Sequence, residues 1–213
     1  MAITMKDKLV IIGAGPHAKV VADILYQNGQ YEIIGLVDDI DKEGFLGLKV
    51  IGNDNYLKVL FNQGVSKAFI AIGNNRIRRK LFETVQGIGF EIINVISRNA
   101  VISPYVKFGK GVVVMPGAVI NVDTVIGNGC IVNTNSSIDH DGKVGKFVHI
   151  APGTAIAGNV SIGDETFCGV GCRVIDGIKI EENVMVGAGA VVISDIKPNC
   201  TIVGVPAKYI KKG

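Results

Sequence analysis

The hydrophobic positions of this 213-residue chain follow two different periods, one before and one after residue 95. In the first part, short apolar runs alternate with segments whose apolar residues recur at helical spacing. The predicted strands are 8–13, 32–39, 68–73 and 91–95, and the predicted helices are 17–28 and 75–86, the second closed by Gly87. Strands that alternate with helices predict a parallel sheet with right-handed crossovers, as in a Rossmann-like α/β domain.

From residue 96 onward, every sixth residue is apolar. All 17 positions from Ile96 to Val192 are apolar and 15 of them are Ile or Val, while the position two earlier is always small or β-branched. Glycine often follows the aliphatic residue, where it would allow a tight turn. An unbroken six-residue repeat predicts a parallel β-helix whose interior the aliphatic residues fill. We therefore expect an α/β domain at 1–95 and a β-helix domain at 96–213.

Composition excludes some classes of protein. With 48% hydrophobic and 19% charged residues, the chain is not of the disordered type, and a net charge of +3 does not favour nucleic-acid binding. No apolar run approaches the ~20 residues that span a bilayer. The first residues lack the apolar stretch of a signal peptide, so we expect a cytoplasmic protein with reduced cysteines. Cys168 occupies an aliphatic position of the repeat and Cys130 and Cys172 occupy small ones, which favours core packing over metal binding.

A glycine-rich loop, GAGPHA at 13–18, lies between a predicted strand and a predicted helix, and Asp38 follows 25 residues after Gly13. Such a loop lets the backbone approach a phosphate at the helix N-terminus. The motif fits an NAD-dependent oxidoreductase, a nucleotide-binding domain of another kind, or a purely structural turn. Because the β-helix begins where a second nucleotide-binding half would follow, we favour a nucleotide sugar over NAD.

The β-helix carries two histidines. His140 lies between Asp139 and Asp141, and a carboxylate bound to one ring nitrogen would leave the other able to accept a proton. The alternative is a polar surface turn. Residues 18 apart would stack on successive coils, so Gly158 would leave open space for a substrate over His140 and offer its N–H to an oxyanion. A zinc hydratase would need three histidine ligands here, and His149 is only the second.

The order of motifs resembles a known family. GAGPHAK, VDD, AIGNN, SSIDHD with HIAPG, and a final VGVPAK are similar to those of the bacterial left-handed β-helix sugar acetyltransferases of the PglD and sialic-acid O-acetyltransferase type. The resemblance implies a left-handed coil, a homotrimer and acetyl-CoA as co-substrate, without a metal. It implies N-acetylation of a nucleotide-linked amino sugar, of the UDP-4-amino-4,6-dideoxy type, for glycan biosynthesis. O-acetylation of a sugar or sialic acid, or a non-enzymatic nucleotide sensor, remains an alternative.

The resemblance also implies roles for individual residues. His140 would be the catalytic base, and because the family commonly has Glu where this chain has Asp141, either Asp141 or Asp139 would orient the ring. The implied substrate contacts are Gly15, Pro16 and His17 at the diphosphate, Asp38 and Asp39 at the uridine, and Gly73 and Asn74 at the inner part of the ligand. The implied acetyl-CoA contacts are His149, Gly158, Val170 and Ala188. The lysines Lys208, Lys211 and Lys212 would meet CoA phosphates or form a solubilising tail.

Overall fold

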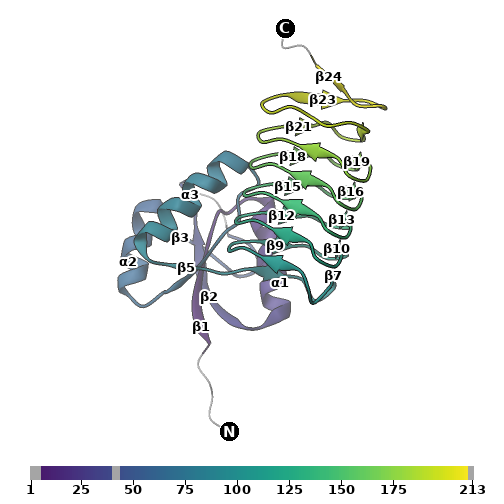
Figure 1. Ribbon diagram of the computed structural model, residues 1–213. Helices are drawn as coiled ribbons and strands as arrows, with labels where there is room; N and C mark the ends of the chain where they lie inside the picture. Colours follow the sequence, from purple (N-terminus) through teal and green to yellow (C-terminus); the bar gives the residue numbers. More distant parts are fainter. Residues whose placement is uncertain (1–5, 40–43, 211–213) are drawn as a thin grey trace. The chain divides into compact units, whose positions relative to one another are not determined.

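The computed structural model describes residues 6–39 and 44–210, which divide into two compact units between Arg98 and Asn99. The first unit has a parallel sheet of order β3-β2-β1-β4-β5 with helices packed along it (Figure 1). Its strands are β1 (Asp7–Ile12), β2 (Tyr31–Val37), β3 (Val50–Gly52), β4 (Lys67–Ile70), β5 (Glu91–Ile92) and β6 (Val95–Ile96). Its helices are α1 (Pro16–Asn28), a 3₁₀ turn at Asp54–Tyr56, α2 (Leu57–Asn62) and α3 (Asn75–Ile88).

The central strand β1 explains why this unit forms a parallel sheet. Its residues Leu9 to Ile12 are all buried, which is the pattern of a strand covered on both faces. Helix α1 buries Val21 and Leu25 and ends at Gly29, whose φ of 63° is left-handed. The carboxyl end of β1 therefore leads straight into the glycine loop and α1, as the sequence predicted.

Three features of the first unit differ from the prediction. Strand β3 and helix α2 were not expected, because they are too short to show a period. Helix α3 runs through Gly87 and ends at Gly89, so the expected end at Gly87 is wrong. Gly87 is exposed on a helix, where glycine costs about 1 kcal/mol without ending it. Gly89 has a φ of 114°, which ends the helix.

The second unit is a parallel β-helix whose two-residue strands repeat every six residues and form three sheets (Figure 1). One sheet holds β7 (Val101–Ile102), β10 (Val119–Ile120), β13 (Ser137–Ile138), β16 (Ala155–Ile156), β19 (Arg173–Val174) and β22 (Val191–Val192). The next holds β8 (Lys107–Phe108), β11 (Val125–Ile126), β14 (Lys143–Val144), β17 (Ser161–Ile162) and β20 (Lys179–Ile180). The third includes β9 (Val113–Val114), β12 (Ile131–Val132), β15 (His149–Ile150), β18 (Phe167–Cys168), β21 (Met185–Val186), β23 (Thr201–Val203) and β24 (Lys208–Tyr209).

The register confirms coils of 18 residues, since Val119 pairs with Ser137 on the next coil. The aliphatic position of each repeat points inward, and Ile138 and Ile150 are fully buried. Polar residues at the small position bond to turn carbonyls, as Thr124 Oγ1 does to Asp139 O at 2.9 Å. The cysteines at 130, 168 and 172 are fully buried free thiols, which confirms that they pack in the core.

The glycines after the aliphatic residues serve a different purpose from the expected tight turn. Positive φ falls instead on the column 111, 129, 147, 165 and 183 and on two similar columns. A Cβ on Gly127 would lie 2.5 Å from the carbonyl oxygen of Gly145 on the next coil. Glycine is therefore needed there because neighbouring coils approach closely, and a side chain would push them apart.

Candidate active site on the β-helix and nucleotide loop of the first unit

The turn between β13 and β14 carries His140, and its backbone is tied to the coils on both sides. Asp141 N donates to Val122 O at 3.0 Å, and Asn159 N donates to His140 O at 3.0 Å. The Asp139 carbonyl accepts from Thr124 Oγ1 at 2.9 Å. The ladder of the β-helix thus fixes the point from which the imidazole projects.

Asp141 is the carboxylate that orients the imidazole. His140 Nδ1 lies 2.8 Å from Asp141 Oδ2, and the two side chains are 48% and 56% exposed. Asp141 has a φ of 57°, a left-handed conformation that Asp tolerates better than most residues. Asp139 is engaged elsewhere, because its Oδ1 accepts from Asn121 Nδ2 at 2.7 Å and from His140 N at 2.8 Å. Although one methylene shorter than Glu, Asp141 reaches the ring.

These contacts set the protonation behaviour of the site. The hydrogen bond from Asn121, together with the His140 N–H, holds the pKa of the Asp139 carboxyl below its usual value. The hydrogen bond to Asp141 raises the pKa of His140, and the charges of Asp139, Asp141 and Asp176 act in the same direction. With Nδ1–H donated to Asp141, the neutral ring presents Nε2 as an acceptor. The geometry is that of a general base.

Gly158 stacks on His140 as the 18-residue spacing predicted, but the space above it is not open. A Cβ on Gly158 would lie 2.6 Å from both Cε1 and Nε2 of His140, so the imidazole itself fills that space. The expectation of a free approach over Gly158 is wrong, because glycine here makes room for the catalytic ring.

His149 is held by two neighbours on the β-helix. Its Nε2 lies 3.1 Å from Asn133 Nδ2, and the Asn133 amide is oriented by Thr134 N, which donates to its Oδ1 at 2.8 Å. The ring packs edge-on against Phe167, with centroids 5.0 Å apart. His149 lies on β15 and His140 on the β13–β14 turn, so the two histidines belong to different sides of the coil.

The expected cofactor positions farther along the coil are on its surface. Val170 and Ala188 occupy equivalent turns one coil apart, and both are exposed. The Val170 carbonyl accepts from Gly189 N at 2.8 Å and is therefore already engaged. Lys208 is exposed on β24, whereas residues 211–212, which hold the other two tail lysines, lie outside the described residues.

In the first unit, the glycine loop follows β1 and leads into α1. Gly13 has a φ of 109°, and a Cβ on it would lie 2.9 Å from Ala71 O, so the turn requires glycine. Asp38 Oδ2 accepts from Ala14 N at 2.8 Å and braces the loop. Around the Cβ position of Gly15, by contrast, no described atom lies within 4 Å. No described side chain caps α1, whose first turn holds no acid, so its N–H groups can receive an anion.

His17 is neutral and partly enclosed. Burial, helped by the positive charge of Arg78, lowers the pKa of His17 to about 4. Its Nε2 is shut off from solvent and has no hydrogen-bond partner among the described residues. A ligand would therefore meet His17 through Nδ1 or the backbone, and not as a cation.

A buried arginine shapes the second loop of this unit, where β4 leads into α3. Arg78 is 1% exposed and donates to Ile72 O and Gly73 O at 3.0 Å each and to Asn75 Oδ1 at 2.8 Å. Asn74 Oδ1 caps α3 by accepting from Ile77 N at 3.1 Å, which leaves its Nδ2 for a ligand. No described atom lies within 4 Å of the Cβ position of Gly73.

Acidic side chains gather after β2. Asp38 is half-buried and Asp39 is exposed, and Asp39 Oδ1 accepts from Asp54 N at 3.4 Å. Burial and the charges of Asp39 and Asp38 raise the pKa of Asp54. Carboxylates at the carboxyl end of a parallel sheet can accept from the N–H and O–H groups of a nucleoside.

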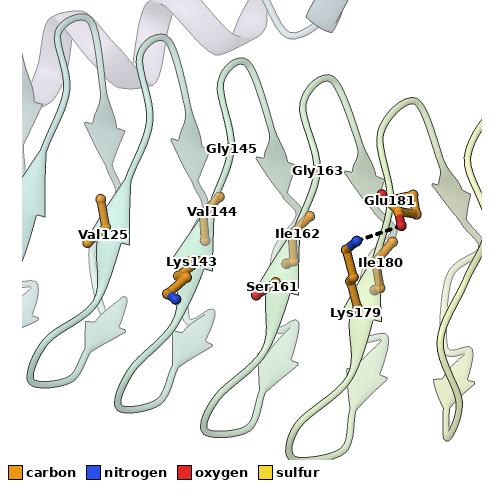
Figure 2. A pocket seen from close by; sticks show the side chains of 10 residues that line it. All are labelled: Val125, Lys143, Val144, Gly145, Ser161, Ile162, Gly163, Lys179, Ile180 and Glu181. Carbon is orange, nitrogen blue, oxygen red and sulfur yellow. Dashed lines mark ion pairs between the residues drawn. The ribbon is translucent and has the colours of Figure 1, made fainter.

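An open hollow of about 450 Å³ lies elsewhere, on the sheet of β11, β14, β17 and β20 (Figure 2). Lys143 and Lys179 line it, and Lys179 Nζ pairs with Glu181 at 2.8 Å. No residue expected in the active site lines it. Within residues 6–39 and 44–210, no group of three His, Cys, Asp or Glu side chains could hold a metal ion, and no helix is long and apolar enough to cross a membrane.

Comparison with known proteins places these two sites in one family. Residues 8–85 match the model of the PglD N-terminal domain. PerB from Caulobacter crescentus, solved in complex with CoA and GDP-perosamine, is 43% identical with a TM-score of 0.93, and the match covers 99% of each chain. The chain belongs to the PglD-type left-handed β-helix acetyltransferases. The acetyltransferase domain of PglB from Neisseria gonorrhoeae is 38% identical, with a TM-score of 0.92, over 96% of this PglD-type chain and 100% of that one.

A curated relative is less informative about this PglD-type acetyltransferase. An uncharacterised protein of Acanthamoeba polyphaga mimivirus is 40% identical over 114 residues, which is 52% of this chain. The chain spans 22% of that viral protein, so the relative tells nothing of the whole activity.

Sequence reasoning missed three polar residues of this PglD-type acetyltransferase. Arg78 gave no signal, because it is one basic residue among several in α3. Asn133 could have been found from its position two residues before the next small slot, beside the strand that carries His149. Asp176 lies 36 residues after His140, which is two coils, and that spacing would have placed it in the same column.

Proposed function

We propose that this protein transfers the acetyl group of acetyl-CoA to the amine of a nucleotide-linked sugar, as a step in bacterial glycan biosynthesis. The observation that carries the proposal is the His140–Asp141 pair, which leaves Nε2 as a proton acceptor on the β-helix surface. PerB, at 43% identity, was solved with CoA and GDP-perosamine, and two related structures are mutants of a single histidine. The gonococcal PglB domain was solved with acetyl coenzyme A.

The chemical step is a direct attack on the thioester. The amine nitrogen forms a bond to the acetyl carbonyl carbon while His140 Nε2 accepts the proton that the nitrogen loses. The carbon–sulfur bond breaks, and the proton then passes from His140 to the sulfur of CoA. Asp141 stabilises the imidazolium through Nδ1–H throughout.

The nucleotide would bind in the first unit. The uncapped N-terminus of α1, with Gly15, Pro16 and His17, would receive the diphosphate, and the open space at Gly15 supports a close approach to the backbone. Asp38 and Asp39 would accept from the nucleoside. Gly73 and Asn74, held by Arg78, would contact the inner part of the ligand.

Acetyl-CoA would bind along the β-helix. His149 is fixed by Asn133 and Phe167, and it would contact the cofactor with its exposed edge. Backbone groups of Gly158, Val170 and Ala188 would continue that contact along successive coils. This arrangement needs no metal ion.

We also infer a cytoplasmic homotrimer, in which neighbouring subunits complete each active site. Light scattering of the purified protein should give three times the chain mass. An active monomer at assay concentration would contradict this assembly.

The experiment that tests the function is a turnover assay with acetyl-CoA and a panel of GDP-, UDP- and dTDP-linked 4-amino-4,6-dideoxy sugars. We expect an amide product with at least one nucleotide, and none with His140→Ala at the same enzyme concentration. Transfer only to hydroxyl groups of sugars would instead establish an O-acetyltransferase. Tight NAD binding by calorimetry, without acetyl transfer, would favour an oxidoreductase.

A further inference from the structure

Asp176 lies two coils from His140 in the same column of turn residues. The position that a Cβ on Gly158 would occupy is 2.6 Å from His140 Nε2 and 3.0 Å from Asp176 Oδ1. The two atoms are thus separated by no more than about two hydrogen-bond lengths. Since Gly158 between them has no side chain, both can reach one ligand atom in front of this column.

Both atoms are hydrogen-bond acceptors. His140 Nε2 accepts because Nδ1 is bound to Asp141. An ionised carboxylate such as Asp176 can only accept, and its Oδ1 is oriented by Asn159 Nδ2, which donates to it at 3.2 Å. Asp139, the other nearby acid, has its Oδ1 engaged with Asn121 and the His140 N–H. Asp176 is therefore the carboxylate of this column that faces the reacting position.

The number of donors on the acceptor group then decides which substrate fits. A primary amine has at least two N–H groups, so it can donate one to His140 Nε2 and another to Asp176 Oδ1. A hydroxyl has a single O–H and leaves one of the two acceptors without a donor, which costs binding free energy. We propose that Asp176 is a specificity-determining residue that makes the acceptor position select an amine over a hydroxyl.

The proposal rests on the proposed function and adds to it the reason for N- over O-acetylation. It assigns Asp176 to substrate recognition only, because the proton that leaves the amine during attack goes to His140. A charged carboxylate also favours the protonated amine in the encounter complex, since an ammonium group carries the opposite charge.

The test measures selectivity as a ratio of affinities. The ligands are GDP-, UDP- and dTDP-linked pairs of a 4-amino-4,6-dideoxy sugar and its 4-hydroxy counterpart, titrated by calorimetry in the presence of CoA. We expect the wild-type protein to bind the amine of a pair more tightly, and Asp176→Ala to reduce that ratio about ten- to a hundredfold. Asp176→Asn keeps an oxygen at the same position and should retain part of the preference. Glu182→Ala, which removes the same charge from another turn of the β-helix, should change neither affinity.

Several outcomes would overturn the proposal. One is a wild-type protein that binds no amine of the panel better than its hydroxyl counterpart. Another is an amine-to-hydroxyl ratio that stays the same in Asp176→Ala and Asp176→Asn. Loss of both affinities in equal proportion would show a structural role instead. The turnover assay keeps the two questions apart, because a wild-type enzyme that acetylates no amine refutes the proposed function, whereas an unchanged ratio refutes only the role of Asp176.

Discussion

The imidazole of His140 occupies the space that a side chain at Gly158 would fill. Because a Cβ there would lie 2.6 Å from Cε1 and Nε2, Gly158→Ala should displace the ring while leaving its chemistry unchanged. We expect kcat to fall about a hundredfold, since a shift of about 1 Å at the reacting atoms has an effect of that size. The KM for the nucleotide sugar should change little. Steady-state kinetics with both substrates measures this.

The control for that variant is Gly87→Ala. No described atom lies within 4 Å of its Cβ position on α3, so this change should raise the thermal midpoint slightly and leave kcat unchanged. A Gly158→Ala enzyme with normal kcat would show that the imidazole moves freely, against the geometry described above.

Removing the base itself should cost more. We predict that His140→Ala lowers turnover by about 10²–10⁴, the usual effect of losing a general base. The side chain is 48% exposed, so the thermal midpoint should stay close to that of the wild type. Calorimetry should show unchanged acetyl-CoA affinity, because the ring acts on the amine. Near-normal turnover would remove His140 from the mechanism.

The raised pKa of His140 predicts the pH profile. The base is the neutral ring, which becomes populated only above its pKa, so the acid limb of kcat/KM should lie above the ordinary histidine value of 6.5. Asp141→Asn removes the hydrogen bond that contributes most to the raised pKa, and Asn tolerates the left-handed φ at this position. The acid limb should therefore move to lower pH, while the plateau falls because the ring is less well oriented. A limb that stays in place in Asp141→Asn would contradict this assignment.

His17 should behave in the opposite way. With its pKa lowered to about 4, it stays neutral from pH 5.5 to 8, whereas His140 titrates within that range. NMR spectra of the imidazole protons should show one resonance that is constant and one that moves. The assignments would be checked with His17→Asn and His140→Asn. A His17 signal that titrates near pH 6.5 would mean that the ring is solvated and that Arg78 is farther away.

The sequence predicted most of the β-helix, because one strong constraint acts on it at every sixth residue. An inward position such as Ile138 must be apolar, and a coil closes after 18 residues, so strands and stacking could be counted from the chain alone. The same counting brought Gly158 to His140. It could not tell that the ring fills the space over Gly158, since a rotamer is chosen by local contacts such as the bond to Asp141.

The first unit was less predictable, for a physical reason. A two- or three-residue strand such as β3 has no period to detect, and its pairing with β2 depends on the rest of the sheet. Arg78 is buried because backbone carbonyls such as those of Ile72 and Gly73 receive its N–H groups. Sequence patterns carry no sign of such carbonyls, so a buried arginine on an otherwise basic helix surface was expected to be exposed.

The glycine loop of the first unit offers a test that separates ligand binding from folding. Gly13 needs a φ of 109° and lies against Ala71 O, so Gly13→Ala should lower the thermal midpoint by several degrees. Gly15 has an ordinary φ of −87° and no described atom within 4 Å of its Cβ position, so Gly15→Ala should fold normally. A methyl group there would still stand where a diphosphate approaches the backbone. We expect the KM for the nucleotide sugar to rise tenfold or more, about 1.4 kcal/mol, while the KM for acetyl-CoA stays the same.

Gly15→Ala is a cleaner test of the nucleotide site than Asp38→Ala. The Asp38 carboxylate accepts from Ala14 N, so its removal would loosen the loop as well as delete a ligand contact. Gly73→Ala serves as the matching variant in the second loop, where no described atom lies within 4 Å of the Cβ position either. If both variants fold normally and bind the nucleotide sugar like the wild type, neither loop contacts the ligand. The assignment of His17 and Asn74 would then be wrong together with that of the two glycines.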